Sequence, residues 1–257
     1  MITVISPAKT LDFDEQKLTR KKTTPDFLEH SEELIGQLKK APAAKLGELM
    51  GISPKLAELN YQRYQDWETP FTTANAKQAL LAFKGDVYTG FDCDHWSPDD
   101  FNFAQKHLRI LSGLYGVLRP LDLIQPYRLE MGTRLKNARG KDLYEFWNEI
   151  ITDAIKSSIK KTRSKYLINL ASNEYFGSIR PKNLGVPVVT PVFKDEKNGK
   201  FKIISFFAKR ARGMMSNFMV RNKLTSPDDL KGFDTAGYWF DAKTSTGDTL
   251  VFMRNEQ

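Results

Sequence analysis

Short runs of β-branched and other hydrophobic residues recur along the chain, and polar or turn-forming residues bound each run. This pattern is typical of strands that contribute to a folded core. It predicts strands at residues 2–6, 86–90, 166–170, 186–193, 201–207 and 249–254.

Four helix starts are marked by a Ser or Thr followed directly by proline. The hydroxyl can accept a hydrogen bond from the first helical turn, and proline favours the first helical position. The four pairs are Thr24 and Pro25, Ser53 and Pro54, Ser97 and Pro98, and Ser226 and Pro227.

Two hairpins are predicted in the C-terminal half. Asn198 and Gly199 can adopt the positive φ angles of a tight turn between two of the predicted strands. A second hairpin covers residues 237–254 and turns near Gly247.

Helices dominate the N-terminal half and hairpins the C-terminal half, so the sequence predicts an α+β (mixed α/β) fold with a mixed sheet. No Gly/Ser linker, low-complexity tract or internal repeat divides the chain. We therefore expect a single compact domain over residues 1–257.

Composition narrows the classes of protein. The chain is 40% hydrophobic and 27% charged, as in ordinary globular proteins, and its net charge of +8 favours anionic partners such as nucleic acid, phosphorylated metabolites or anionic membranes. The single cysteine, Cys93, excludes a disulfide framework and a cysteine-based metal cage. Because neither a signal-peptide pattern nor a membrane-spanning apolar stretch is present, we expect a cytoplasmic protein without a membrane partner.

The stretch SFFAKRARGMMSNFMVRNK, residues 205–223, predicts an amphipathic helix after a strand. Helical spacing puts Phe207, Ala211, Met214, Met215 and Phe218 on one stripe and Lys209, Arg210, Arg212, Arg221 and Lys223 opposite or beside it. The basic side is either a solvated back or a nucleic-acid surface. A membrane-surface helix is a third interpretation, and the narrow stripe disfavours it. No acid interrupts residues 200–227, which a simple solvated back does not explain.

Residues 46–60, LGELMGISPKLAELN, resemble the helix-hairpin-helix motif of DNA-binding proteins. Gly51 and Ile52 match its turn, whereas Ser53 stands where a second glycine is usual. A helix start at Pro54 would offer backbone N–H groups to a phosphate, with Lys45 and Lys55 nearby. An ordinary helical hairpin is the alternative.

Arginines and charged strand ends give two further candidate sites. Arg119, Arg128 and Arg134 lie in a loop-rich stretch and could clamp an anion or pair with Asp122 and Glu130. Polar residues after predicted strands are typical of ligand sites in α/β proteins. This second group could perform acid–base chemistry and comprises Lys9, Lys84, Asp86 and Glu174.

A metal site or a known catalytic motif is not indicated. Residues 92–96, DCDHW, contain four possible metal ligands, but adjacent residues rarely converge on one ion, so we interpret them as an exposed turn. The nucleotide-binding, zinc-protease and serine-hydrolase motifs are absent from the sequence. We expect neither a metal nor a cofactor.

Several long strings together resemble the YaaA family of bacterial peroxide-stress-resistance proteins. They are ISPAKTLDF, FKGDVYTG, LSGLYGVLRPLDLIQPYRLEMGTRL, GKDLYEFW, INLASNEYF and FKIISFFAKRARGMMSNFM, and they span essentially the whole chain. The resemblance implies a cytosolic protein that protects against hydrogen peroxide and is associated with low free intracellular iron. It also implies a single-domain fold with a helix-hairpin-helix element and a basic cleft for duplex DNA.

The leading hypothesis is a monomeric DNA-binding stress protein that contacts the phosphate backbone rather than base sequence. The rival is an enzyme acting on a small anionic or nucleotide-like substrate at the strand ends, and an iron-binding buffer is the third possibility. The candidate DNA contacts are Lys45, Gly51, Ser53, Lys55, Arg119, Arg128, Arg134, Lys209, Arg210, Arg212 and Arg221.

Overall fold

A computed structural model describes residues 1–256 and has the mixed α+β architecture that the sequence predicts. Eight strands form one sheet, in the order β11-β12-β9-β8-β1-β5-β6, with β10 paired to β9. These strands are β1 (Ile2–Ile5), β5 (Leu108–Ser112), β6 (Gly116–Leu118), β8 (Leu167–Leu170), β9 (Val188–Lys197), β10 (Lys200–Lys202), β11 (Trp239–Phe240) and β12 (Thr249–Arg254).

Two small two-stranded sheets lie outside this main sheet. One pairs β2 (Thr10–Leu11) with β4 (Phe83–Lys84), and the other pairs β3 (Lys77–Gln78) with β7 (Leu123–Ile124). The 3-10 helices are η1 (Tyr88–Gly90), η2 (Cys93–His95), η3 (Pro181–Asn183), η4 (Pro227–Gly232) and η5 (Thr235–Gly237). The α-helices are α1 (Leu28–Leu38), α2 (Ala43–Met50), α3 (Pro54–Asp66), α4 (Ala79–Ala82), α5 (Pro98–His107), α6 (Leu143–Trp147), α7 (Ile150–Thr162), α8 (Asn173–Phe176) and α9 (Ser205–Arg221).

The centre of the molecule has three layers, with α7 and α9 on opposite faces of the sheet. The Thr3 hydroxyl contacts Met219 of α9, whereas Arg109, which pairs with Val4 in register, donates to Ser158 of α7. Because successive strand residues point to opposite faces, Thr3 and Val4 identify the two sides. All four residues of β1 are buried, as expected for a central parallel strand.

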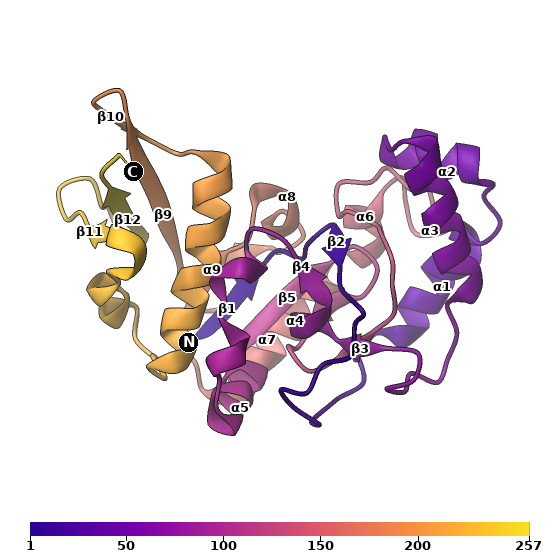
Figure 1. Cartoon of the computed structure of the whole chain (residues 1–257), viewed down its shortest axis with the longest axis horizontal. Coiled ribbons are helices and arrows are strands. Elements are labelled where there is room, and N and C mark those ends of the chain that lie inside the picture. The colour runs from indigo at the N-terminus through magenta and orange to yellow at the C-terminus, as the bar shows by residue number, and fades with distance from the viewer. Residues whose placement is uncertain (257) are drawn as a thin grey trace.

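Figure 1 shows the α1–α3 group at one end of the long axis and the strands β10, β11 and β12 at the other, with α9 between these two ends. The helix α9 follows the β9–β10 hairpin and runs back along the sheet. Its first turns therefore lie near the carboxyl ends of the parallel strands, and its last turn lies near the start of β1, where the Met1 amine donates to Thr225 O at 3.4 Å.

Most of the predicted strands are confirmed, and two are corrected. Residues 86–90 form part of a tight turn and η1 rather than a strand, because Thr89 and Gly90 bond back to Gly85 and Val87. The strand predicted to reach residue 207 ends at Lys202, since Ser205 begins α9. The hairpin at Asn198 and Gly199 is confirmed, with φ values of 56° and 71°.

The predicted helix starts are confirmed fully in two places. Ser53 and Ser97 cap α3 and α5, and Ser97 forms a reciprocal capping box with Asp100. Ser226 caps η4, which stays a 3-10 helix. The start predicted at Thr24 is wrong: α1 begins only at Leu28, because the preceding residues are held in a bridge between Thr23 and Asp122.

Candidate nucleic-acid interface and strand-end cluster

The strands β1 and β8 bring Lys9 and Glu174 to the same edge of the sheet. The strands are parallel neighbours whose last paired residues are Ile5 and Leu170. Just beyond this pair, Ser6 Oγ accepts a hydrogen bond from the Ser172 backbone N–H at 2.9 Å. The sequence therefore places both charged residues where parallel strands of α/β folds present ligand-binding groups.

Glu130 is the centre of the charged groups at this edge. Its Oε1 atom lies 3.2 Å from Lys9 Nζ and 2.9 Å from Arg128 Nη2. Its Oε2 atom is buried and has no hydrogen-bond partner among the described residues. One oxygen of this carboxylate thus contacts two cations, while the other remains available to a hydrogen-bond donor. We call Lys9, Arg128, Glu130 and Glu174 the strand-end cluster.

Two tyrosines beside the cluster, Tyr127 and Tyr175, are buried and neutral. Tyr127 and Tyr175 line the small cavity beside Glu130. Burial, then neighbouring tyrosines and the carboxylates of Glu174 and Glu130, raises the pKa of Tyr175 well above its ordinary value. Burial likewise raises the pKa of Tyr127. Both hydroxyls therefore stay protonated and can donate hydrogen bonds.

Two of the predicted strand-end residues have different surroundings. Lys84 pairs with Asp12 at 3.2 Å across the β2–β4 sheet, whereas Asp86 lies in the turn before η1. Glu174 accepts the Gly132 N–H at 2.9 Å, which ties it to the loop that carries Glu130. The structure thus joins Lys9 and Glu174 through residues 128–132 and gives Lys84 a separate carboxylate partner.

The first half of α9 carries three cations for which no ion pair exists among residues 1–256. Lys209 and Arg210 are exposed, and Arg212 is half-buried. Burial lowers the pKa of Arg212, and no neighbouring acid offsets this effect. Unneutralised cations on a packed helix form an electrostatic surface suited to an anion.

Arg221, the fourth candidate on α9, has a structural role at the other end of the helix. It bonds to Asp100 of α5 at 3.0 Å and to the His95 backbone carbonyl. Lys223 binds the same carboxylate. Asp100 therefore supplies the acid that residues 200–227 lack, but only for the C-terminal end.

The α2–α3 hairpin uses several of its backbone donors internally. Gly51 adopts φ of 60° as the cap of α2, and its N–H bonds to Gly47 O, as does the N–H of Ile52. The Ser53 hydroxyl accepts the Leu56 N–H at 3.4 Å. A phosphate at this turn would therefore have to use the N–H groups of Ser53 and Lys55. Lys55 is exposed, while Lys45 pairs with Glu48 at 2.9 Å.

The three loop arginines do not form one clamp. Arg119 follows β6 near the start of β5, as the pairing of Ile110 with Leu118 shows, and it bonds to Asp122 at 2.8 Å. Arg128 is held by Glu130, at the opposite edge of the sheet. Arg134 is exposed and has no ion pair within residues 1–256. The pairing of Arg119 and Arg128 with acids is the loop-pinning alternative that the sequence left open.

The sequence interpretation did not identify Arg63 as a candidate. It also did not predict that Glu130 contacts both Lys9 and Arg128. Arg63 on α3 is half-buried, and burial followed by the neighbouring charge of Arg128 lowers its pKa. The Tyr64 hydroxyl donates to the Arg128 backbone carbonyl. These contacts connect α3 to the strand-end cluster. The sequence around Arg63 and Tyr64, NYQRY at residues 60–64, matches no motif that would have singled them out.

The segment with four possible metal ligands forms a turn, as predicted, in which Asp92, Asp94 and His95 are exposed and Cys93 is half-buried. Cys93–His95 are η2, and His95 Nδ1 lies 2.7 Å from Asp92 Oδ1. Burial, followed by the charges of Asp94 and Asp92, raises the pKa of Cys93 to about 12. Its thiol is therefore a poor nucleophile at neutral pH.

The chain matches a known protein family. Residues 1–244 fit the model of a family described as peroxide stress protein YaaA. Within residues 1–256, no helix has both the length and the apolar character needed to cross a bilayer.

Proposed function

The chain belongs to the peroxide stress protein YaaA family, and from this premise we propose that it is a cytoplasmic protein that binds duplex DNA during peroxide stress. The observation that carries the proposal is the unneutralised group Lys209, Arg210 and Arg212 on α9. Phosphates attract such cations without regard to base sequence. Arg134 and Lys55 are further exposed cations that would extend the contact.

The close packing of α9 against η1 supports this proposal. Gly213 and Gly90 allow the helix to lie against η1, because a Cβ atom on Gly213 would be 1.7 Å from Val87 O. A fixed helix holds its cations in place, so fewer side chains need to be ordered when DNA binds. Arg119 and Arg128 would contact phosphate only by leaving their carboxylate partners.

The test is a titration of a fluorescent duplex with purified protein from about 50 to about 200 mM salt. We expect Arg210→Ala to weaken binding to unrelated sequences equally and to reduce the slope of log K against log salt by about one. Arg119→Ala should change the slope less, because Asp122 already neutralises that arginine.

The matched control is Lys156→Ala, which removes an exposed lysine from α7. It should leave the slope unchanged. A wild-type protein with no affinity for duplex at the lowest salt would refute the proposal, and equal effects of Arg210→Ala and Lys156→Ala would remove α9 from the interface.

We extend the proposal to limitation of free intracellular iron and of oxidative DNA damage, on the basis of the family's stress role. No group of three or more metal-ligating side chains is assembled within residues 1–256. Equilibrium dialysis with ferrous iron tests how the protein would limit free iron. A tight stoichiometric site would mean that the protein lowers free iron by binding it directly.

A second candidate function is acid–base catalysis on a small anionic substrate at the strand-end cluster. The buried, unpartnered Oε2 of Glu130 favours it, since a desolvated carboxylate oxygen can accept a proton. The Lys9 ammonium, 3.2 Å from Oε1, could donate one of its own protons to the leaving group, and the proton held by Glu130 would then restore the ammonium. Phosphorus NMR of nucleoside monophosphates incubated with wild type and Glu130→Gln checks this idea, and identical, unchanging spectra would eliminate it.

A further inference from the structure

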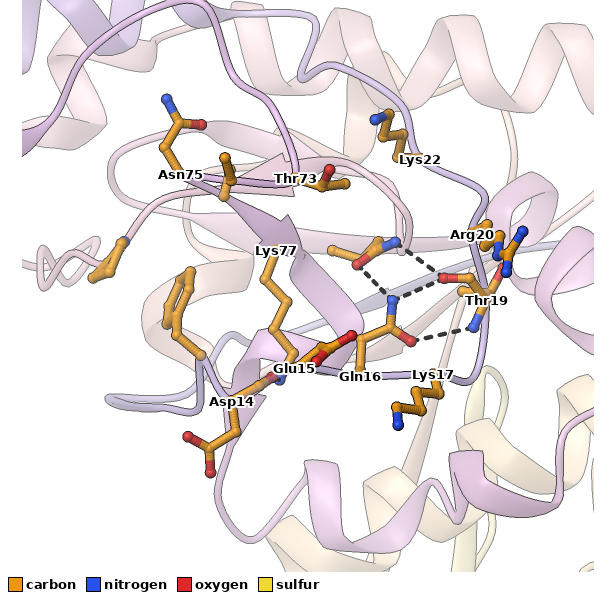
Figure 2. A pocket seen from close by; sticks show the side chains of 15 residues that line it. Asp14, Glu15, Gln16, Lys17, Thr19, Arg20, Lys22, Thr73, Asn75 and Lys77 are labelled. Carbon is orange, nitrogen blue, oxygen red and sulfur yellow. Dashed lines mark hydrogen bonds between the residues drawn. The ribbon is translucent and has the colours of Figure 1, made fainter.

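A large cavity lies between the loop at residues 13–22 and the segment at residues 73–78, and none of the candidate residues considered so far lines it. Its volume is about 910 Å³, within the range of small-molecule sites. Figure 2 shows its labelled lining, with Lys17, Arg20 and Lys22 following the loop and Asn75 across from them.

The loop that forms this cavity is held by two glutamines. Gln16 Oε1 accepts the N–H groups of Leu18 and Thr19, at 2.8 and 3.2 Å. Its Nε2 atom donates to Thr19 O and to Oε1 of the buried Gln78. Gln78 in turn donates to the Lys21 carbonyl at 3.0 Å. The loop therefore has a fixed backbone that presents its side chains in a defined order.

Three lysine or arginine side chains of this loop are not neutralised. Lys17, Arg20 and Lys22 are exposed, and the structure gives them no ion pair within residues 1–256. Lys77 differs, because its ammonium group donates to Asp14 O at 2.8 Å and lies 3.5 Å from Asp12. Lys17, Arg20 and Lys22 thus give one side of the cavity a positive charge that can attract an anion. The charge of Lys77 is already balanced by Asp12.

Acids and apolar groups complete the lining. Asp14 and Glu15 are exposed carboxylates at the start of the loop, and Figure 2 places Asp14 away from Arg20 and Lys22. Phe13 and Pro126 contribute apolar surface. A fitting ligand carries negative charge at one end, a flat apolar body, and hydrogen-bond donors at the other end.

We propose that this cavity binds a nucleoside polyphosphate. Its phosphates would contact Lys17, Arg20 and Lys22 through charge-assisted hydrogen bonds. The base would lie along Phe13 and Pro126 and direct its amino group, a hydrogen-bond donor, to Asp14 or Glu15. No residue of α9 lines this cavity, so the nucleotide proposal does not depend on whether α9 binds DNA.

Isothermal titration with ADP, GDP and pyrophosphate tests the site in the full chain. We expect one nucleotide per protein, and we expect the triple variant Lys17→Ala, Arg20→Ala, Lys22→Ala to weaken binding by at least about tenfold. The matched control is Lys156→Ala, Lys160→Ala, Lys161→Ala, which removes the same charge from the exposed side of α7. It should bind as wild type does.

Other outcomes overturn the inference and assign the phosphate chemistry elsewhere. If a short oligonucleotide binds, its binding requires Lys17, Arg20 and Lys22, and the nucleotides do not bind, then the loop is a surface for single-stranded nucleic acid. If nucleotide binding survives the loop triple but is lost in Glu130→Gln, the ligand occupies the strand-end cluster. If neither nucleotide nor pyrophosphate gives heat, no such site exists. Circular dichroism of each variant shows whether the fold is retained.

Discussion

Asp100 shows how one carboxylate can join two distant parts of the chain, the start of α5 and the end of α9. It closes the capping box of α5 by accepting the Ser97 N–H at 2.7 Å. It also receives Arg221 and Lys223 from the end of α9. Burial alone would raise the pKa of Asp100, but the hydrogen bonds from Lys223 and Ser97 outweigh it and lower the pKa to about 2.

This shift predicts a contribution to stability that depends on pH. The folded pKa lies below the ordinary value of 3.8, so the stabilisation is present above about pH 4 and is lost as the pH falls toward 2. We expect Asp100→Asn to lower the free energy of unfolding at pH 7 by roughly 2 kcal/mol. Urea unfolding at several pH values measures both effects.

Asp99→Asn is the neighbouring control, because Asp99 is exposed and accepts only one long hydrogen bond, from Asn102 at 3.4 Å. It should leave the acid dependence intact. If Asp100→Asn retained the full loss of stability between pH 4 and 2, the ion pairs at Asp100 would not be its source.

The role of Arg221 could not be read from the sequence. Helical spacing correctly put it beside the buried stripe, but its partner Asp100 is far away along the chain and lies on another helix. Capping chemistry, by contrast, is local: Ser97 and Asp100 are three residues apart, and the sequence predicted that helix start correctly.

Among the elements, the position of α9 depends on close backbone contact with η1. Gly213 faces Val87 O, and a Cβ atom on Gly90 would lie 2.5 Å from Met214 N. Such separations leave no room for a methyl group, so the two glycines determine how α9 approaches the turn that carries Tyr88.

Gly213→Ala should therefore displace α9 and destabilise the protein by about 2–4 kcal/mol, as overpacking in a tight contact does. Gly36→Ala is the control: Gly36 lies in α1 with nothing within 4 Å of a new Cβ. That change should stabilise the helix by about 0.5–1 kcal/mol. Thermal unfolding compares the two, and equal melting temperatures for both variants would contradict this account.

The same contact explains an error in the sequence interpretation. Residues 86–90 have the β-branched and aromatic character of a strand, yet they fold as a turn and η1 because Gly90 must approach α9. Long-range packing overrode local propensity there. The predictions for residues 249–254 and for the Asn198 hairpin succeeded because neighbouring residues specify a strand and its turn.

In the molecule as a whole, Arg128 of the loop arginines meets two of the predicted strand-end residues, Lys9 and Glu174, at one edge of the sheet. The sequence placed Lys9 and Glu174 after strands, and the parallel pairing of β1 with β8 brings those strand ends together. It could not place Arg128 and Glu130, because their position depends on a loop that returns to this edge. The sequence could not predict the cavity at residues 13–22 either, because the residues that line it are far apart along the chain.

The central position of β1 has a consequence for how the protein is made. Its two neighbours, β5 and β8, begin at Leu108 and Leu167, so β1 is synthesised well before either of the strands that flank it. At about 5–20 residues per second, this apolar segment waits roughly ten seconds or longer for its second neighbour. During that interval the segment ITVI has an unpaired strand edge, and we expect it to be open to pairing with other chains.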